Sequence, residues 1–315
     1  MNHEEAKRHL EARNWTEAEK HVTLALGERR GSAKRRHELL VGLARAQRGQ
    51  RKFVESEENL RQAADLAGKN HSLYVQALEE LIALELDQNK YSEAQKTIEE
   101  IVRRESAQPR PNHARLAQCS RKLGMALVNS DRRAEALQAF ERAVKLSEKA
   151  FGPDHVETAN GLAELGALYR ENGDHAEAQH CLRRALRIHR AVSGADSQEA
   201  TQDLYQLAAS LEESGDLDGA ASEYERVLAL RARQVGADRD QTADAQLRLA
   251  ILYLQAGRTS QARELLTQAV PVLERQAGTQ YALAVAALAQ AEEDAGRPEE
   301  AKRWREKSPL VTTRS

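Results

Sequence analysis

The stretch LGALYRENGDHAEAQHCLRRAL, residues 165–186, decides how the chain folds. Its first part carries apolar residues at spacings of three and four, breaks at Asn172-Gly173-Asp174, and then resumes the same spacing. Residues spaced in this way lie on one face of a helix, and a Gly at the break suits the left-handed conformation that ends many helices. We therefore predict two short helices that pack against each other, because neither can bury its apolar face alone.

The same pattern recurs along the chain. Shifts of 42 residues give LAASLEESGDLDGAASEYERVL (207–228), LAILYLQAGRTSQARELLTQAV (249–270) and, toward the N-terminus, LGMALVNSDRRAEALQAFERAV (123–144). A small residue after each turn marks both these copies and looser ones: Ala18, Ser56, Ala94, Ala136, Ala178, Ala220, Ala262 and Ala301, at intervals of 38, 38, 42, 42, 42, 42 and 39. A period in this range predicts an array of eight helical hairpins, each packed on its neighbours.

Small residues and glycines support this arrangement. Gly166, Ala208 and Ala250 would face the marker residues of their own hairpins, which lets the paired helices approach closely. The first helices should end near one glycine each in the later copies: Gly173, Gly215, Gly257 and Gly296.

Composition agrees with an all-helical fold and limits the partners. Aromatic residues make up 4% of the chain and charged residues 30%, and the net charge of -2 gives no overall attraction to nucleic acid or membrane. No apolar run approaches the roughly 20 residues of a membrane helix, and the start MNHEEAKRHL is unlike a signal peptide. We expect a cytoplasmic protein that binds neither nucleic acid nor membrane.

Charge is uneven along the chain. Residues 1–69 hold 15 Lys or Arg against 11 Asp or Glu, whereas residues 196–256 hold 5 against 12. The basic stretch RRGSAKRR (29–36) is interpreted as a solvated turn between hairpins, with contact to an acidic partner as the alternative.

Catalytic patterns are missing from the sequence. There is no HExxH, and GLAELG (161–166) has glycine spacing like that of a phosphate-binding loop but lacks the following Lys. Cys119 and Cys181 form no CxxC motif and are expected to be buried thiols. The residues His175, His180, Cys181 and His189 do not stack on one helix face. We predict no enzyme activity, no cofactor and no metal site.

The pattern Leu-Gly-x-x-Tyr, then Ala-x-x-x-apolar-x-x-Ala, resembles the tetratricopeptide repeat and extends over residues 3–307. Its 42-residue form, clearest in FGPDHVETANGLAELGALYRENGDHAEAQHCLRRALRI (151–188), is similar to the repeats of kinesin light chains. The family's first-helix Trp is absent, and Ala or Ile replaces the Gly in several copies. The resemblance implies an all-α fold, a right-handed α-solenoid of eight hairpins. We divide it into three irregular hairpins (1–110), five regular ones (111–308) and a disordered tail (309–315).

In proteins of this family, first helices line the inner groove, and first-helix residues not used for packing contact the ligand. Carried over by alignment, the expected partner-binding residues are Arg121, Met125, Asn129, Asn160, Arg170, Gln202, Tyr205, Glu212, Asp244, Leu247 and Ile251. Leu247 and Ile251 next to Tyr205 suggest apolar pockets beside polar donors, which suits a bound peptide. The alternative is that the C-terminal hairpin or a tight superhelix covers these apolar residues.

Two ligand modes of the family do not carry over. The carboxylate clamp of chaperone-binding repeats resembles a set of Lys, Asn and Arg, but the corresponding residues here include Met125, Ala163 and Gln202. The paired Asn of kinesin light chains is replaced by pairs such as Arg121-Lys122 and Tyr205-Gln206.

We therefore predict a non-enzymatic scaffold or adaptor that binds a protein or peptide in its groove, as a monomer or with weak self-association. Acidic residues near Glu212, Glu213 and Asp244 suggest that the bound segment has a basic end. A peptide-responsive regulator and a self-associating structural unit are the alternatives.

Overall fold

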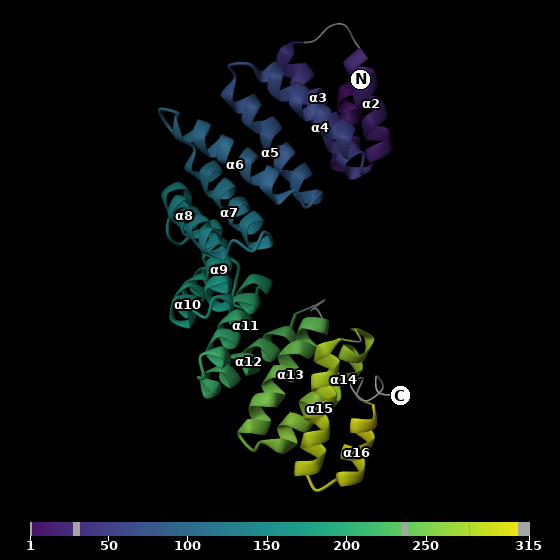
Figure 1. Ribbon diagram of the computed structural model, residues 1–315, viewed down its shortest axis with the longest axis vertical. Helices are drawn as coiled ribbons and strands as arrows, with labels where there is room; N and C mark the ends of the chain where they lie inside the picture. The colour runs from purple at the N-terminus through teal and green to yellow at the C-terminus, as the bar shows by residue number, and fades with distance from the viewer. Residues whose placement is uncertain (1, 28–31, 235–238, 277, 308–315) are drawn as a thin grey trace. The chain divides into compact units, whose positions relative to one another are not determined.

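The structure is a computed structural model that describes residues 2–27, 32–234, 239–276 and 278–307. Within these ranges the chain forms sixteen α-helices and one short 3-10 helix, and no strand. The helices follow one another as eight hairpins, which confirms the predicted fold class and hairpin count (Figure 1). The predicted disordered tail, 309–315, and residues 29–31 of the basic stretch lie outside the described residues.

Contacts divide the chain into two compact units, 1–151 and 152–315, with four hairpins each. The N-terminal unit contains α1 (Asn2–Glu11), α2 (Trp15–Gly27), α3 (Ala33–Gly49), α4 (Phe53–Ala67), α5 (His71–Asp87), α6 (Tyr91–Ser106), α7 (His113–Asn129) and α8 (Arg133–Phe151). The C-terminal unit contains α9 (Val156–Glu171), α10 (His175–Val192), α11 (Gln198–Glu213), α12 (Leu217–Arg231), α13 (Arg239–Gln255), α14 (Thr259–Leu273), η1 (Glu274–Gln276), α15 (Thr279–Asp294) and α16 (Pro298–Glu306). The division at residue 110, drawn from the regularity of the repeat, stays a prediction.

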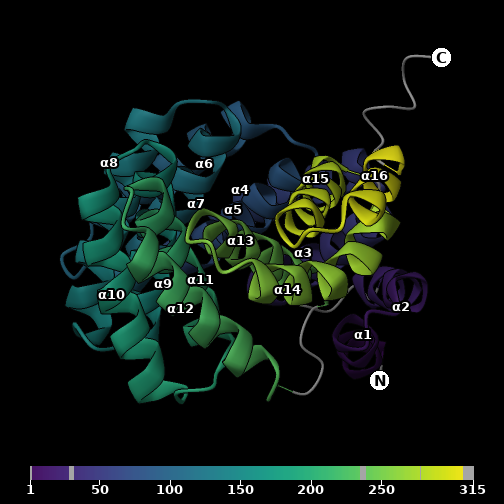
Figure 2. The same ribbon diagram turned by 90° about the horizontal axis from the view of Figure 1, so that it is seen from below.

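The glycine turns lie where the sequence predicts them. In the C-terminal unit each first helix ends two residues before its glycine, and all four glycines are left-handed: Gly173 (φ 86°), Gly215 (φ 90°), Gly257 (φ 71°) and Gly296 (φ 73°). This conformation favours Gly because it has no Cβ. After a three-residue link the second helix runs back along the first; α15 and α16, for example, lie side by side in both views (Figures 1 and 2).

Close packing within a hairpin depends on the small residues that the sequence marked. A Cβ added to Gly166 of α9 would lie 2.8 Å from Leu182 Cγ and 3.2 Å from the Ala178 carbonyl oxygen, both of α10. Such distances leave no room for a side chain, so the predicted close approach at Gly166 is confirmed. Ala178, Leu182 and Ala185 are all fully buried, as expected.

First helices of neighbouring hairpins also contact one another. Direct contacts join α1 to α3 and α3 to α5 in the N-terminal unit, and α9 to α11 and α13 to α15 in the C-terminal unit. Each unit therefore presents a surface made of first helices, here called its first-helix face. This is the surface on which the resemblance places ligands.

Candidate partner-binding site

A cavity of about 300 Å³ opens in the C-terminal unit among α11, α12, α13 and α15. Its walls are mostly polar side chains from first helices, with one contribution from the end of α12: Gln202, Tyr205, Arg231, Asp240, Gln241, Asp244 and Gln280. Three of these residues, Gln202, Tyr205 and Asp244, belong to the set predicted to bind a partner. The structure thus brings them together at one place on the first-helix face.

Asp244 is the centre of a hydrogen-bond network in this cavity. The hydroxyl of Tyr205 donates to its Oδ2, Gln280 Nε2 donates to its Oδ1 at 2.6 Å, and Arg248 Nε lies 3.4 Å from Oδ2. Burial and the hydrogen bond to Asp244 raise the pKa of the Tyr205 phenol to about 12, so the phenol keeps its proton and acts as a donor. The carboxylate already has three donors from its own chain.

A second part of the network holds Glu212. The hydroxyl of Tyr224, a fully buried side chain of α12, donates to Glu212 Oε2 at 2.9 Å, and Arg248 reaches the same oxygen at 3.3 Å. Tyr205 and Tyr224 meet edge to face, with ring centroids 5.7 Å apart. Arg248 therefore bridges Glu212 and Asp244, and this bridging fixes one side of the cavity.

Arg231 closes the cavity from the second-helix side. It is the last residue of α12, is 6% exposed, and lies with its guanidinium carbon 5.4 Å from the centre of the Tyr205 ring. It donates to the backbone carbonyl of Gln241 and, at 3.4 Å, to the Gln241 side chain. Gln202 differs from these residues: its amide is exposed and has no hydrogen-bond partner in the described part of the chain. The cavity therefore combines a fixed polar wall with an amide that is open to a ligand.

Comparison with known proteins identifies the repeat. The family model described as tetratricopeptide repeat matches residues 116–191 and 200–275. The chain is a tetratricopeptide-repeat protein. No curated protein sequence matches it.

Solved structures share the fold of this repeat protein. BtubC (BKLC) from P. vanneervenii aligns over 79% of this chain and 94% of its own, with 18% identity and a TM-score of 0.62. A putative kinesin light chain from P. anserina aligns over 65% and 99%, with 22% identity and a TM-score of 0.54. The quorum sensor NprR from B. thuringiensis aligns over 96% and 83%, with 15% identity and a TM-score of 0.58. At these identities the likeness concerns the fold.

Two other residues predicted to bind a partner, Arg170 and Asn160, already have polar partners within the chain. Arg170 of α9 forms an ion pair with Glu213 of α11, with 2.5 Å between NH1 and Oε1. Asn160 Oδ1 lies 3.1 Å from Nε2 of His189, whose Nδ1 lies 2.6 Å from Asp203 Oδ2. These contacts join α9 and α10 to α11. They give Asn160 and Arg170 a structural role besides the predicted one.

The expectation that Leu247 offers an apolar pocket on the groove is corrected by the structure. Leu247 is 2% exposed and lies in the core of the C-terminal unit, and Ile251 is half-buried against the same core. Tyr205 occupies the equivalent position in the preceding repeat but keeps its hydroxyl at the cavity. Burial of a Leu side chain is favourable throughout, whereas a Tyr side chain must keep its hydroxyl hydrogen-bonded, which explains why Leu247 is buried in the core and Tyr205 is not. Leu247 is therefore a core residue, whereas Ile251 keeps partial exposure.

The remaining predicted residues belong to the N-terminal unit. Arg121, Met125 and Asn129 lie on α7; Met125 is 49% exposed, and Asn129 is exposed and donates to the Met125 carbonyl oxygen at 2.8 Å. The cavity of the C-terminal unit does not include them. Their role in binding stays a prediction.

Sequence reasoning missed four residues that line the cavity: Arg231, Asp240, Gln241 and Gln280. Gln241 and Gln280 lie in the first turns of α13 and α15, outside the positions carried over from the family. Arg231 lies on a second helix. A signal for it existed, because residues 105, 147, 189 and 231, each 42 apart and all buried, are polar at the end of successive second helices: Glu105, Ser147, His189 and Arg231.

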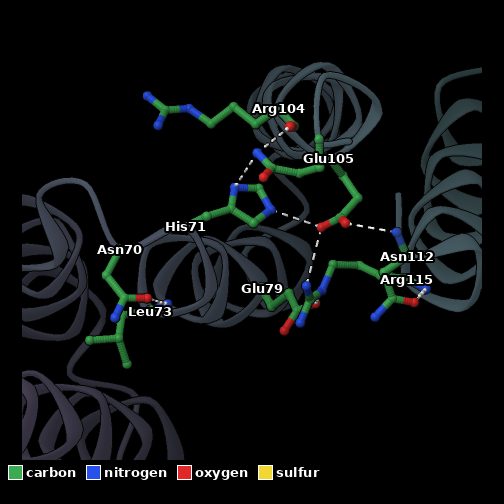
Figure 3. A network of polar contacts seen from close by, with 9 residues as sticks. Asn70, His71, Leu73, Glu79, Arg104, Glu105, Asn112 and Arg115 are labelled. Atoms are coloured by element: carbon green, nitrogen blue, oxygen red, sulfur yellow. Dashed lines mark hydrogen bonds and ion pairs between the residues drawn. The ribbon is translucent and has the colours of Figure 1, made fainter. Parts of the chain in front are cut away.

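Glu105 shows how such a position is satisfied in the N-terminal unit. Its carboxylate lies 2.9 Å from His71 Nε2 and accepts from the Asn112 backbone N–H at 2.8 Å and from Arg115 NH1 at 3.2 Å (Figure 3). Arg115 also donates to Glu79 at 3.1 Å. Burial would raise the pKa of the Glu105 carboxyl, but these donors hold it below its ordinary value. The cluster links α5, α6 and α7.

Several other expectations concern what the chain does not carry. Cys119 and Cys181 are buried thiols, as predicted. Among the described residues, no group of three His, Cys, Asp or Glu side chains is placed to hold a metal ion. Of the helices that the structure describes, none has the length and apolar character needed to span a bilayer.

Proposed function

We propose that this tetratricopeptide-repeat protein is a non-enzymatic, cytoplasmic adaptor whose C-terminal unit binds an extended segment of a partner protein at the cavity around Gln202, Tyr205 and Asp244. Its repeats form a protein-interaction scaffold. The observation that carries the proposal is the cavity of about 300 Å³ on the first-helix face, in which three glutamine side chains come together. Side-chain amides both donate and accept, so they can satisfy the backbone of an extended peptide.

The fixed wall of the cavity supports binding without large rearrangement. Tyr205, Asp244, Gln280 and Arg248 are held by mutual hydrogen bonds, so their side-chain entropy is already lost before a ligand arrives. Gln202 then provides the open hydrogen-bonding group. Tyr205 provides a partly exposed ring, and Tyr is common among the residues that dominate binding energy.

A phage-displayed library of random twelve-residue peptides, selected on the immobilised full chain, tests the proposal. Peptides that bind the C-terminal cavity should bind the Gln202→Ala variant about 30-fold more weakly than the wild type, which corresponds to about 2 kcal/mol. The double variant Gln202→Ala plus Tyr205→Phe should weaken binding by at least as much. Gln246→Ala is the matched control, because Gln246 also lies on the C-terminal unit but donates to Gln268 at 2.8 Å, away from the cavity. Equal affinity for wild-type protein and the Gln202 variant in every selected peptide would refute the proposed site.

The predicted basic end of the partner is tested with the same peptides. Asp244 and Glu212 already have donors within the chain, and Glu213 is paired with Arg170. A partner with a basic end must compete with these contacts, so its affinity should fall as salt rises. If the affinity is the same at low and high salt, the proposal that the bound segment has a basic end is refuted.

Two other functions can be separated by solution measurements. A peptide-responsive regulator should change its radius of gyration in X-ray scattering when a selected peptide is added, whereas a rigid adaptor should not. A self-associating structural unit should show a mass that rises with concentration in ultracentrifugation.

A further inference from the structure

Helix α10 carries a row of arginines on the face that points away from the core. The buried face of this helix packs on α9 and α11. Arg183, Arg187 and Arg190 follow one another at steps of four and three, which keeps them on one helix face, and all three are exposed. These three residues are here called the arginine stripe. The stripe lies on a second helix, so it is a different surface from the first-helix face.

Few carboxylates neutralise the arginine stripe. Arg187 pairs with Asp154 at 2.8 Å. Arg183 donates to the Gln179 side chain at 3.2 Å, and neither Arg183 nor Arg190 forms an ion pair in the described part of the chain. Other exposed arginines pair with an acid three or four residues away on their own helix: Arg61, Arg103, Arg104, Arg226 and Arg303. The stripe does not follow this pattern.

Within the stripe, the residues at these spacings carry the same charge. Arg183 and Arg187 are four residues apart, and Arg187 and Arg190 are three apart. Like charges at such spacings destabilise a helix. Attraction to the negative end of the helix dipole explains only Arg190, because that effect is confined to the last turn and α10 ends at Val192. The stripe therefore destabilises the isolated protein, and a partner with negative charge would offset this.

The stripe is a local exception in an acidic unit. Residues 152–315 hold 19 Lys or Arg against 26 Asp or Glu, yet α10 holds four Arg against one Glu. No other described helix of this unit has more basic than acidic residues. A long polyanion, such as a nucleic acid or an anionic bilayer, would extend past the stripe over acidic surface. Since α10 also has no Phe, Tyr or Trp on which bases could stack, a short acidic segment of a protein fits better.

We propose that the arginine stripe docks an acidic helix of a partner protein, which lies along α10. The three guanidinium groups are spread over about 10 Å of helix axis. A helix with Asp or Glu at the same steps of four and three has the same rise, so each carboxylate meets one guanidinium in the paired geometry that these groups favour. Side chains on one face of an extended chain recur about every 6.7 Å. That spacing fits Arg183 and Arg187 but not the closer Arg187 and Arg190, so the occupant is a helix.

A labelled peptide of about 20 residues tests the proposal. It consists of Ala, Gln and Glu, with the Glu residues at steps of four, three and four, which place them on one helix face. A second peptide has the same composition, but its Glu residues are distributed around the helix. Fluorescence anisotropy at low salt measures the binding of both peptides to the full chain. The striped peptide should bind about fivefold more tightly than the distributed one, and high salt should remove the difference.

The variant Arg183→Gln plus Arg190→Gln removes the two arginines of the stripe that form no ion pair. The striped peptide should bind it about fivefold more weakly than the wild type, as expected for the loss of two exposed ion pairs. The matched control is Lys302→Gln plus Arg303→Gln on α16, which removes the same charge from exposed positions of the same unit and should leave binding unchanged. In the free protein the α10 variant should melt at or slightly above the wild-type temperature, because like charges are removed.

Four outcomes would overturn the docking site: no binding of the striped peptide at low salt, equal binding of the two peptides, equal binding to the α10 variant and the α16 control, or a lower melting temperature of the α10 variant, which would give the arginines a structural role. A single-stranded oligonucleotide or a phosphatidylserine vesicle that binds with the same dependence on Arg183 and Arg190 would overturn the choice of a protein helix. The proposed function is tested separately, because Gln202→Ala should leave binding of the striped peptide unchanged.

Discussion

The two units build the same hairpin turn from different residues. In the C-terminal unit the left-handed position after each first helix is Gly in all four hairpins; in the N-terminal unit it is Arg13, Arg51, Asn89 and Asp131, with φ between 54° and 60°. The backbone conformation is thus imposed by the packing of two antiparallel helices, whichever residue stands there. Glycine lowers the cost of this conformation but is not required for it.

Side chains at the turn give the N-terminal unit contacts that glycine cannot make. The Asn89 side chain accepts a hydrogen bond from the Tyr91 hydroxyl at 2.9 Å, and Asp131 pairs with Arg133 at 3.5 Å. Arg13 lines a cavity of this unit. The N-terminal unit therefore has strained left-handed residues at its turns, and their side chains make polar contacts. In the C-terminal unit the turns are glycines, and the polar contacts come from helical residues such as Tyr205 and Asp244.

The units also differ at a buried polar position that ends their second helices. Glu105 in the N-terminal unit is 3% exposed and accepts several donors, whereas His189 in the C-terminal unit is 2% exposed and is paired with Asp203. The two positions are two 42-residue periods apart. An acid with basic partners stands at the first position and a base with an acidic partner at the second, yet both side chains link three helices. The position therefore requires a polar connection rather than a particular charge.

The largest expected effect comes from breaking the His189 link. Asp203→Ala leaves the His189 ring buried without its carboxylate and should lower the free energy of unfolding of the C-terminal unit by about 3 kcal/mol. Urea denaturation measures the loss, and hydrogen exchange should localise it to α9, α10 and α11. The double variant His189→Leu plus Asp203→Leu should recover much of the stability, because both buried members of the pair are removed and only the half-buried Asn160 amide loses a partner. A loss as large in the double variant as in Asp203→Ala would contradict this account.

A buried carboxyl makes the N-terminal unit sensitive to pH. Glu85, 8% exposed, accepts from the Thr97 hydroxyl at 3.1 Å through one oxygen, and its other oxygen has no partner among the described residues. Burial, with a smaller contribution from Glu57 and Glu93, raises the pKa of this carboxyl from 4.5 to about 7. An acid with a higher pKa in the folded state contributes stability below pH about 4.5, and this contribution is lost as the pH rises to about 7.

Glu85→Gln should remove that dependence. Its unfolding free energy should be close to that of the wild type at pH 4.5 and higher at pH 8, by at most about 3 kcal/mol. The matching residue of the C-terminal unit is Tyr253, so unfolding of that unit should not respond to the substitution. Urea denaturation of both proteins at several pH values checks the prediction. If the unfolding free energies of variant and wild type change with pH in the same way, the pKa of Glu85 is not raised in the folded protein.

Overpacking inside a hairpin should have a somewhat smaller effect. Gly166→Leu forces a side chain into the space held by Leu182 and the Ala178 backbone, at an expected cost of about 1 to 3 kcal/mol. Gly124 is the matching residue of the N-terminal unit, and there a Cβ would lie 2.8 Å from the ring of Phe140. Because an aromatic ring yields less than a Leu side chain, Gly124→Ala should cost more than Gly166→Ala. The melting temperatures of Gly124→Ala, Gly166→Ala and the wild type measure this difference. If both variants melt at the same temperature as the wild type, the packing argument is refuted.

Much of the fold could be predicted from the sequence because each hairpin repeats a local pattern. The period of the marker alanines and the glycine turns depend on neighbours within one hairpin, and both are confirmed. Gln202, Tyr205 and Asp244 were carried over by alignment to the repeat family, and the structure brings them together at one cavity, while their role in binding stays a prediction.

The rest of the candidate site depends on neighbouring hairpins, which a single repeat does not describe. Whether Leu247 stays on the surface or enters the core depends on the helices on both sides of α13, and alignment to a family position cannot show this. Arg231 and Gln280 reach the cavity from α12 and α15, so their role appears only when three hairpins are assembled. The left-handed Arg13 was missed for a different reason: in the irregular hairpins no glycine marks the turn.

Exchanging turn residues between the units should give the smallest effect and tests directly whether the turns of the two units are equivalent. The Arg51 side chain is exposed and has no hydrogen-bond or ion-pair partner in the described part of the chain, so Arg51→Gly loses no side-chain contact and keeps the backbone hydrogen bond to Arg48. The substitution relieves a left-handed non-glycine residue, worth about 1 to 2 kcal/mol, but adds flexibility to the unfolded chain. A net stabilisation of about 0.5 to 1 kcal/mol is expected.

The reverse exchange is made at the matching hairpin of the C-terminal unit. No atom lies within 4 Å of the position that a Cβ on Gly215 would take, so Gly215→Ala tests the backbone alone, without a steric clash. It should cost about 1 kcal/mol, and Gly215→Asn should cost less, because Asn tolerates the left-handed conformation better than other non-glycine residues. Urea denaturation of the three variants measures these differences. If Arg51→Gly destabilised the protein while Gly215→Ala had no effect, the turns of the two units would not be equivalent, and the strain assigned to the N-terminal unit would have to be abandoned.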